Sequence, residues 1–157
     1  GVSLITLPSD LGPSGLKKIV DAAGSAFNIL AVTVLTSTTA QDLRALGYDP
    51  RYAPDPTALV LLRAQMAQAA GCRGVVCSGR EAAAVRQACG PEFLIVCPGI
   101  RPAWAAVPGD DQQRIVTPGE AIKNGADYVV VGRPIRQEPD PAAAARRVVA
   151  EIAAAMQ

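Results

Sequence analysis

Short apolar runs alternate along this chain with longer stretches in which apolar residues recur every three or four positions. The runs are short and rich in β-branched residues, which is typical of strands, and the stretches between them have helical spacing. The predicted strands span residues 4–7, 28–35, 74–77, 93–97 and 128–131. Five strand–helix units, each of roughly the 30 residues that a βαβ step needs, predict an α/β fold with a parallel sheet.

Capping sequences mark the ends of the predicted helices. A hydroxyl residue followed three positions later by an acid or amide predicts a capping box, and an aspartate before proline predicts a capped first turn. The capping boxes are expected at Thr38–Gln41, Ser78–Glu81 and Thr117–Glu120, and the Asp-Pro starts at Asp55 and Asp140. Glycines are expected to end four helices, at Gly24, Gly47, Gly90 and Gly125.

The apolar positions also predict which faces are buried. Three valines follow Tyr128, and such a run favours a strand that is covered on both sides. In the third helix the inward face is expected at Leu59, Leu62, Met66 and Ala69. In the last helix it is expected at Ala145, Val148, Val149, Ile152 and Met156.

Polar residues follow the predicted strands, at the edge where α/β folds bind ligands. The candidates are Thr36, Ser37, Ser78, Arg101, Gln112, Gly132 and Arg133. Gly132 lets a ligand approach the backbone, and Arg133 offers a planar fork of donors to phosphate or carboxylate oxygens. On the residues alone, Arg133 could equally be a solvated arginine in a turn, Thr36 a helix cap and Gln112 a solvated loop residue.

Composition narrows the function classes. The 157 residues suffice for one domain, and a net charge of +1 gives no broad basic surface for nucleic acid. No apolar run approaches the ~20 residues of a membrane span. The absence of histidine excludes histidine-based acid–base chemistry, and Lys17, Lys18 and Lys123 all fall in predicted helices. The four cysteines have no CxxC spacing, which favours buried, reduced thiols in a cytoplasmic protein.

Several segments together resemble one family. They are Val32-Thr-Val-Leu-Thr-Ser37, Gly74-Val-Val-Cys-Ser78, Cys97-Pro-Gly-Ile-Arg-Pro102, Gly109-Asp-Asp-Gln-Gln-Arg-Ile-Val-Thr-Pro118 and Gly125-Ala-Asp-Tyr-Val-Val-Val-Gly-Arg-Pro-Ile135. In order and spacing they closely resemble bacterial-type orotidine 5′-phosphate decarboxylases. That family has a (β/α)₈ TIM barrel fold and converts orotidine 5′-monophosphate to UMP and CO₂ in de novo pyrimidine biosynthesis. The resemblance implies no metal, no organic cofactor and a homodimer.

The resemblance also implies roles for five residues. Thr36 would contact the pyrimidine, Arg101 would contact the substrate, and Gln112 would reach from the phosphate towards the base. Gly132 and Arg133 would bind the phosphate. Orotidine 5′-monophosphate or UMP would be the ligand of this site.

The family's catalytic lysine–aspartate segment, an Asp-Leu-Lys-Phe-His-Asp-Ile-Pro type of sequence, has no counterpart here. Residues 1–12 resemble the family's fourth strand and its following turn, with Pro8 where a histidine is usual. We therefore expect residues 1–157 to be a single, partial domain that covers strands four to eight, with no catalytic residue and no activity alone. A non-catalytic phosphate-binding half-barrel and a sugar-phosphate enzyme of the same superfamily, such as a hexulose-phosphate synthase, are the alternatives.

Overall fold

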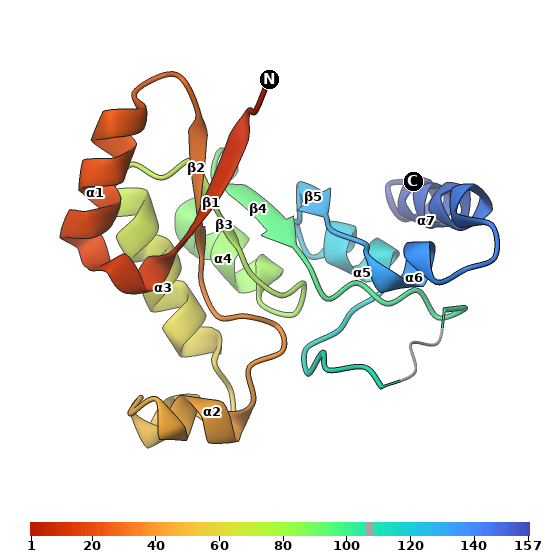
Figure 1. The fold of residues 1–157 in the computed structure, drawn as a ribbon, viewed down its shortest axis with the longest axis horizontal. Helices are drawn as coiled ribbons and strands as arrows, with labels where there is room; N and C mark the ends of the chain where they lie inside the picture. Colours follow the sequence, from red (N-terminus) through yellow and green to blue (C-terminus); the bar gives the residue numbers. More distant parts are fainter. Residues whose placement is uncertain (106–108) are drawn as a thin grey trace.

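A parallel sheet of five strands organises the computed structural model, which describes residues 1–105 and 109–157 (Figure 1). The strands are β1 (Leu4–Pro8), β2 (Asn28–Val32), β3 (Gly74–Val76), β4 (Leu94–Cys97) and β5 (Tyr128–Val129). They pair in chain order, β1-β2-β3-β4-β5, and every pair is parallel. The α/β class with a parallel sheet, predicted from the alternating pattern, is therefore confirmed.

Helical segments make each crossover between neighbouring strands or follow the last one. The α-helices are α1 (Gly12–Ala23), α2 (Ala40–Ala45), α3 (Thr57–Ala69), α4 (Ala82–Cys89), α5 (Pro118–Lys123), α6 (Arg133–Arg136) and α7 (Pro141–Ala155), and the 3₁₀ turns are η1 (Ser9–Leu11) and η2 (Pro50–Tyr52). α3 contacts both α1 and α4, whereas α5 and α6 contact α7. In Figure 1 the first group stands beside β1 to β4, and α7 lies at the far end beyond β5.

The core lies between the sheet and the first group of helices. Its fully buried aliphatic side chains include Leu16 of α1, Val60 of α3, Val75 of β3 and Ile95 of β4. All four cysteines (Cys72, Cys77, Cys89 and Cys97) are buried and free, as expected. A hydrogen bond with Cys97 and burial raise the pKa of the Cys77 thiol, so Cys77 stays protonated at neutral pH.

Gly74 allows β3 and β4 to approach each other. A Cβ at this position would lie 2.2 Å from the carbonyl oxygen of Leu94 and 2.6 Å from its Cβ. Because both neighbours belong to the adjacent strand, Gly74→Ala should lower the free energy of unfolding by about 1–3 kcal/mol, as overpacking does. Urea titration of this variant and of Gly15→Ala, which lies in α1, checks the expectation. Equal midpoints for both variants would contradict it.

Two strands are shorter than predicted. β2 ends at Val32 rather than at residue 35. The last bond to β3 runs from the N–H of Thr33 to the carbonyl of Val76 at 3.0 Å, and the chain then leads into a turn in which the N–H of Thr38 bonds the carbonyl of Leu35 at 2.9 Å. β5 ends at Val129 rather than at residue 131. The expectation that this strand is buried on both faces is wrong, since Tyr128 and Val130 are 52% and 53% exposed. In the described part of the chain β5 pairs only with β4, so its other edge is unpaired.

The predicted helix starts are confirmed in part. The capping box expected at Ser78–Glu81 does not form, because the Ser78 hydroxyl accepts the N–H of Arg80 and α4 begins only at Ala82. Thr117 and Glu120 form the capping box of α5, and the carboxylate of Asp140 accepts the N–H of Ala143 at the start of α7. The box expected at Thr38–Gln41 is wrong by one position: it is formed by Thr39 and Asp42. The hydroxyl of Thr39 accepts the N–H of Asp42, and the carboxylate of Asp42 accepts the N–H of Thr39, so α2 begins one residue later than predicted.

Two predicted helix faces are wrong in part. Leu62 of α3 is exposed, and the buried positions are Leu59, Val60, Ala64 and Ala67. Small residues at helical spacing let α3 lie close to its neighbours, so the packed face follows the alanines rather than the larger side chains. In α7, Val148 is buried but Val149 and Met156 are exposed. Within the described residues α7 contacts mainly α5 and α6, which cover one narrow stripe.

The long connection from β4 to α5 carries most of the candidate site. The loop predicted over residues 103–116 includes residues 106–108, which lie outside the described part. Its remaining residues have no helix or strand apart from a bridge that joins Val116 to Ile100. No described helix has the length and apolar character needed to cross a membrane.

Candidate functional site

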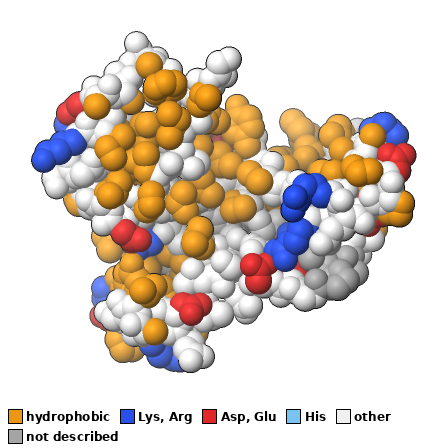
Figure 2. Space-filling view, in the orientation of Figure 1, with side chains coloured by type: hydrophobic (Ala, Val, Ile, Leu, Met, Phe, Trp, Pro, Cys, Tyr) orange, Lys and Arg blue, Asp and Glu red, His pale blue; other side chains and the backbone are white. Residues whose placement is uncertain are grey.

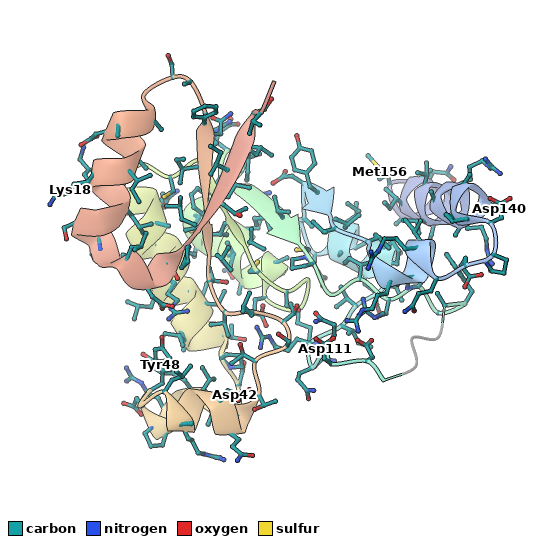
Figure 3. All side chains as sticks on the ribbon, viewed as in Figure 1. Lys18, Asp42, Tyr48, Asp111, Asp140 and Met156 are labelled. Atoms are coloured by element: carbon teal, nitrogen blue, oxygen red, sulfur yellow. The ribbon has the colours of Figure 1, made fainter. Side chains whose placement is uncertain are left out.

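The predicted rim residues meet at the carboxyl edge of the sheet. Because the strands are parallel, the segments that follow them leave the same edge. Thr36 follows β2, Arg101 follows β4, and Arg133 follows β5, while Gln112 returns to this edge on the loop before α5. Figure 3 labels Asp111 on that loop, beside the segment that joins β2 to α2.

Arg101 and Arg133 converge on the carboxylates of this loop. The Nε and Nη2 atoms of Arg101 lie 2.5 and 2.7 Å from the two oxygens of Asp110, which makes the pair bidentate. The Nη2 atom of Arg133 lies 3.1 Å from Asp110 Oδ1 and also donates to Asp111. The backbone N–H of Gln112 donates to Asp110 Oδ1 at 3.1 Å. Figure 2 shows basic and acidic side chains side by side where α6 meets the loop.

Thr36 and Gln112 are in direct contact. The buried hydroxyl of Thr36 donates to Gln112 Oε1, and its carbonyl accepts the N–H of Gln113 at 2.9 Å. Thr36 is therefore not the cap of α2, because Thr39 has that role, and Gln112 is not a freely solvated side chain. The hydrogen bonds bring the candidate pyrimidine contact and the candidate loop glutamine into one place.

Gly99 makes this contact possible. Its φ is +72°, a conformation that glycine adopts without strain. A Cβ here would lie 2.8 Å from the carbonyl oxygen of Arg114 and 3.3 Å from the Cβ of Thr36. The Pro-Gly-Ile-Arg segment thus lets the β4 loop pass directly against the segment after β2.

Beneath the rim, Arg114 and Glu81 form a buried ion pair that the sequence did not predict. Arg114 Nε lies 2.9 Å from Glu81 Oε1, and its Nη2 donates to the carbonyls of Val34 at 2.9 Å and Leu35 at 3.2 Å. The second oxygen of Glu81 accepts the N–H of Ser78 at 2.8 Å. The guanidinium of Arg114 therefore links the loop before α5 to Glu81, which follows β3, and to the segment that carries Thr36.

Burial dominates the electrostatics of this pair. The Glu81 side chain is 2% exposed and that of Arg114 is 9% exposed. Desolvation raises the pKa of Glu81, and the charge of Arg114 and the hydrogen bonds to the carboxylate oppose that rise. The carboxylate depends on its arginine to remain charged inside the protein. The sequence predicts Glu81 only as the acid of a capping box and gives no sign of its pairing with Arg114.

Ser78 and Arg80 differ in how well they match expectation. Ser78 was expected among the rim residues, but it is fully buried and its hydroxyl donates to the carbonyl of Arg114 at 3.3 Å. It therefore supports the loop from below. Arg80 is exposed, as expected, and its Nε donates to the carbonyl of Ile115 at 3.2 Å.

Gly132 lies at the start of α6, directly before Arg133. Its φ is −99°, so the conformation itself does not require glycine. A Cβ added here would meet nothing within 4 Å, which leaves the space above the backbone open. The role predicted for Gly132, close approach of a phosphate to the backbone, remains a prediction that this open space allows.

The donors of the described site are suited to binding an anion. Its donors are two arginines, an amide, a hydroxyl and backbone N–H groups, whereas Lys17, Lys18 and Lys123 lie in α1 and α5. Among residues 1–105 and 109–157, no three His, Cys, Asp or Glu side chains gather in a way that could hold a metal ion. These residues can bind and orient an anion but offer no lysine to deliver a proton.

Comparison with protein families gives one match over nearly the whole chain. A family model described as "Orotidine 5'-phosphate decarboxylase / HUMPS family" matches residues 1–148. A protein named orotidine 5′-phosphate decarboxylase from Trichlorobacter lovleyi is 46% identical over all of this chain, which covers 65% of that protein. One from Xanthomonas oryzae pv. oryzae is 52% identical over 90% of the chain, with 56% of its own length covered.

Solved structures agree in fold. The orotidine 5′-phosphate decarboxylase from Lactobacillus acidophilus superposes with a TM-score of 0.78 at 32% identity, over 97% of this chain and 64% of its own. An uncharacterized conserved protein from Geobacillus kaustophilus gives 0.73 at 27% identity, over 97% of this chain and 64% of its own. The chain thus spans less than two thirds of the length of these relatives.

Proposed function

The chain belongs to the orotidine 5′-phosphate decarboxylase / HUMPS family, and from this premise we propose that it forms the phosphate- and pyrimidine-binding part of an orotidine 5′-phosphate decarboxylase. The observation that carries the proposal is the convergence of Arg101, Gln112 and Arg133 on one carboxylate. Two guanidinium groups and a backbone N–H around a single anion form a site that a phosphate monoester fits.

In this proposal, different residues of the site bind the phosphate and the base of the ligand. Arg101, Arg133 and the open backbone at Gly132 hold the phosphate. Gln112 belongs to the loop before α5, and its hydrogen bond to Thr36 links this loop to the segment after β2. We infer that Gln112 reaches from the phosphate to the pyrimidine and that Thr36 contacts the base edge. An amide and a hydroxyl are suited to a pyrimidine, whose edge carries both donors and acceptors.

In this proposal the chain contributes binding energy and the reacting groups come from a different segment. Contacts to a remote phosphate help decarboxylation by holding the substrate where charges and a proton donor act on the reacting carbon. Neither those charges nor a lysine proton donor is among the described site residues. The catalytic lysine–aspartate segment of the family is the proposed source, and this chain alone is proposed to be inactive and to use no cofactor or metal.

The sheet supports the proposal that the chain covers strands four to eight of a TIM barrel. β1 and β5 each pair on one side only within the described residues, and five strands cannot close an eight-stranded barrel. A groove of about 450 Å³ with apolar lining, including Leu7, Val34 and Leu35, opens beside β1 and β2. In the complete enzyme, a cytoplasmic homodimer in our proposal, further strands would cover these edges.

A sugar-phosphate enzyme is the second candidate, because the matching family's description includes HUMPS as well as the decarboxylase. A sugar phosphate would use the same arginines but would have no base for Thr36 and Gln112 to contact. The Pro-Gly-Ile-Arg and Gly-Asp-Asp-Gln segments favour the nucleotide. A phosphate-binding half-barrel without catalysis is the third possibility, and it shares the same site.

Titration of the chain with UMP, ribulose 5-phosphate and uridine distinguishes these candidates. We expect UMP to bind at least about tenfold more tightly than ribulose 5-phosphate, since about 1.4 kcal/mol from base contacts gives that factor. Uridine, which has no phosphate, should bind most weakly. Phosphorus NMR or calorimetry measures the affinities, and trapping of released CO₂ from orotidine 5′-monophosphate should show no turnover. A preference for ribulose 5-phosphate would favour the sugar-phosphate enzyme.

A further inference from the structure

The carboxylate of Asp110 is surrounded by the hydrogen-bond donors that an anionic ligand would need. Its carboxylate accepts two hydrogen bonds from Arg101, at 2.5 and 2.7 Å, one from the N–H of Gln112 at 3.1 Å, and lies 3.1 Å from Arg133 Nη2. These three residues are the same ones that the proposed function assigns to the phosphate end of the site. The carboxylate therefore lies where the phosphate would have to bind.

Asp111 is a natural comparison for Asp110. It contacts Arg133 and its side chain is 63% exposed, whereas the side chain of Asp110 is 21% exposed. Asp111 thus sits at the outside of the cluster and bonds one guanidinium, while Asp110 bridges both. Hydrogen bonds from Arg101 hold the pKa of Asp110 below its usual value, so the carboxylate is charged at neutral pH.

We propose that Asp110 is a built-in stand-in for the ligand's phosphate, which occupies the two-arginine site until a phosphate monoester displaces it. The inference rests on the proposed function, because it takes Arg101 and Arg133 to be the phosphate-binding arginines. Asp110 lies next to Gly109, whose φ is +64° and around which an added Cβ would meet nothing within 4 Å. The short 109–112 turn can therefore carry the carboxylate away while Gln112 stays near the site.

Displacement of Asp110 requires a ligand that binds the two arginines strongly. A carboxylate already neutralises one positive charge, so an incoming monoanion exchanges one charge for another and gains little. A phosphate monoester brings nearly two negative charges and three acceptor oxygens to the same arginines. The two arginines therefore favour dianionic phosphate monoesters over singly charged phosphodiesters and carboxylates, while Asp110 lowers the affinity of each ligand by the same factor, because each must displace the same carboxylate.

The test compares the wild-type chain with Asp110→Asn and with the matched control Asp111→Asn. Asparagine keeps the size of the side chain and removes the competing charge. UMP is the dianionic probe, uridine 5′-methylphosphate is the monoanionic probe, and inorganic phosphate is the minimal one. Calorimetry gives each affinity. Circular dichroism and thermal midpoints verify folding, and Asp110→Ser provides a second replacement with the same expected sign.

We expect Asp110→Asn to bind UMP about tenfold more tightly than the wild type, as removal of about 1.4 kcal/mol of competition predicts. The affinity for the methyl ester should rise by a similar factor, because both ligands displace the same carboxylate. Asp111→Asn should change either affinity by less than about threefold, as an exposed pair does. Equal or weaker UMP binding by Asp110→Asn would overturn the inference and make Asp110 a brace for Arg101.

Failure of this inference and failure of the proposed function give different results. If the wild type binds UMP and Asp110→Asn binds it no better, the inference fails and the proposed function stands. If neither binds UMP but the variant binds inorganic phosphate more tightly than the wild type, the proposed function fails and the stand-in role is supported. If neither protein binds UMP or phosphate, both are overturned.

Discussion

Replacing Arg133 with methionine is expected to lower the affinity for UMP by about a hundredfold. A hydrogen bond to a charged group is worth about 1.5–3 kcal/mol, and Arg133 directs its fork at the point where Asp110 and the backbone N–H of Gln112 meet. Loss of one such interaction corresponds to roughly 10- to 150-fold in affinity. Methionine keeps much of the side-chain volume at this position of α6, so the loss of affinity can be assigned to the missing guanidinium group.

Arg136 provides the matched control, since it is an exposed arginine three positions further along α6. Arg136→Met changes the net charge by the same amount and should alter UMP affinity by less than about threefold. Arg133→Lys should be intermediate, because lysine retains the charge but not the planar fork. Calorimetric titration of the three variants checks the order. Equal losses for Arg133→Met and Arg136→Met would show that only overall charge matters and that Arg133 is not a phosphate ligand.

The architecture followed from local signals that do not depend on distant neighbours. Apolar run length, helical spacing and capping residues placed five strands in a parallel sheet and placed the ends of α5 and α7. Parallel strands share a carboxyl edge, so Thr36, Arg101 and Arg133 could be expected to meet without any knowledge of the side-chain geometry. The structure brings them together around the loop that carries Gln112.

The features that could not be predicted from the sequence depend on contacts between residues that are distant in the chain. Glu81 satisfies the rule for a capping acid, and nothing local shows that Arg114, 33 positions away, bonds its other oxygen. Asp110 likewise is one acid in a polar loop until the arginines from two other segments surround it. Burial was misjudged at Tyr128 and Val130 because a strand's period gives its faces but not whether another element covers them.

Replacing Arg114 with methionine should produce the largest loss of stability, about 3–5 kcal/mol in the free energy of unfolding. The change leaves Glu81 as an uncompensated charge inside the protein, where its side chain is only 2% exposed. It also removes the donors that hold the carbonyls of Val34 and Leu35. For a chain of this size the thermal midpoint should fall by roughly 6–20 °C. The exposed pair of Lys17 and Asp21 is the control, since Lys17→Met should cost less than about 1 kcal/mol.

A double variant and a change of pH separate the buried charge from the lost packing. Glu81→Gln with Arg114→Met removes both charges and should recover part of the stability that Arg114→Met loses. Burial already raises the pKa of Glu81, and without Arg114 it rises further. The folded state then binds a proton more tightly than the unfolded state, so the deficit of Arg114→Met relative to the double variant should shrink as the pH falls from 7 towards about 4.5. If that deficit is the same at pH 7 and pH 5, Glu81 is not the source of the instability, and Arg114 stabilises the chain only through the carbonyls after β2.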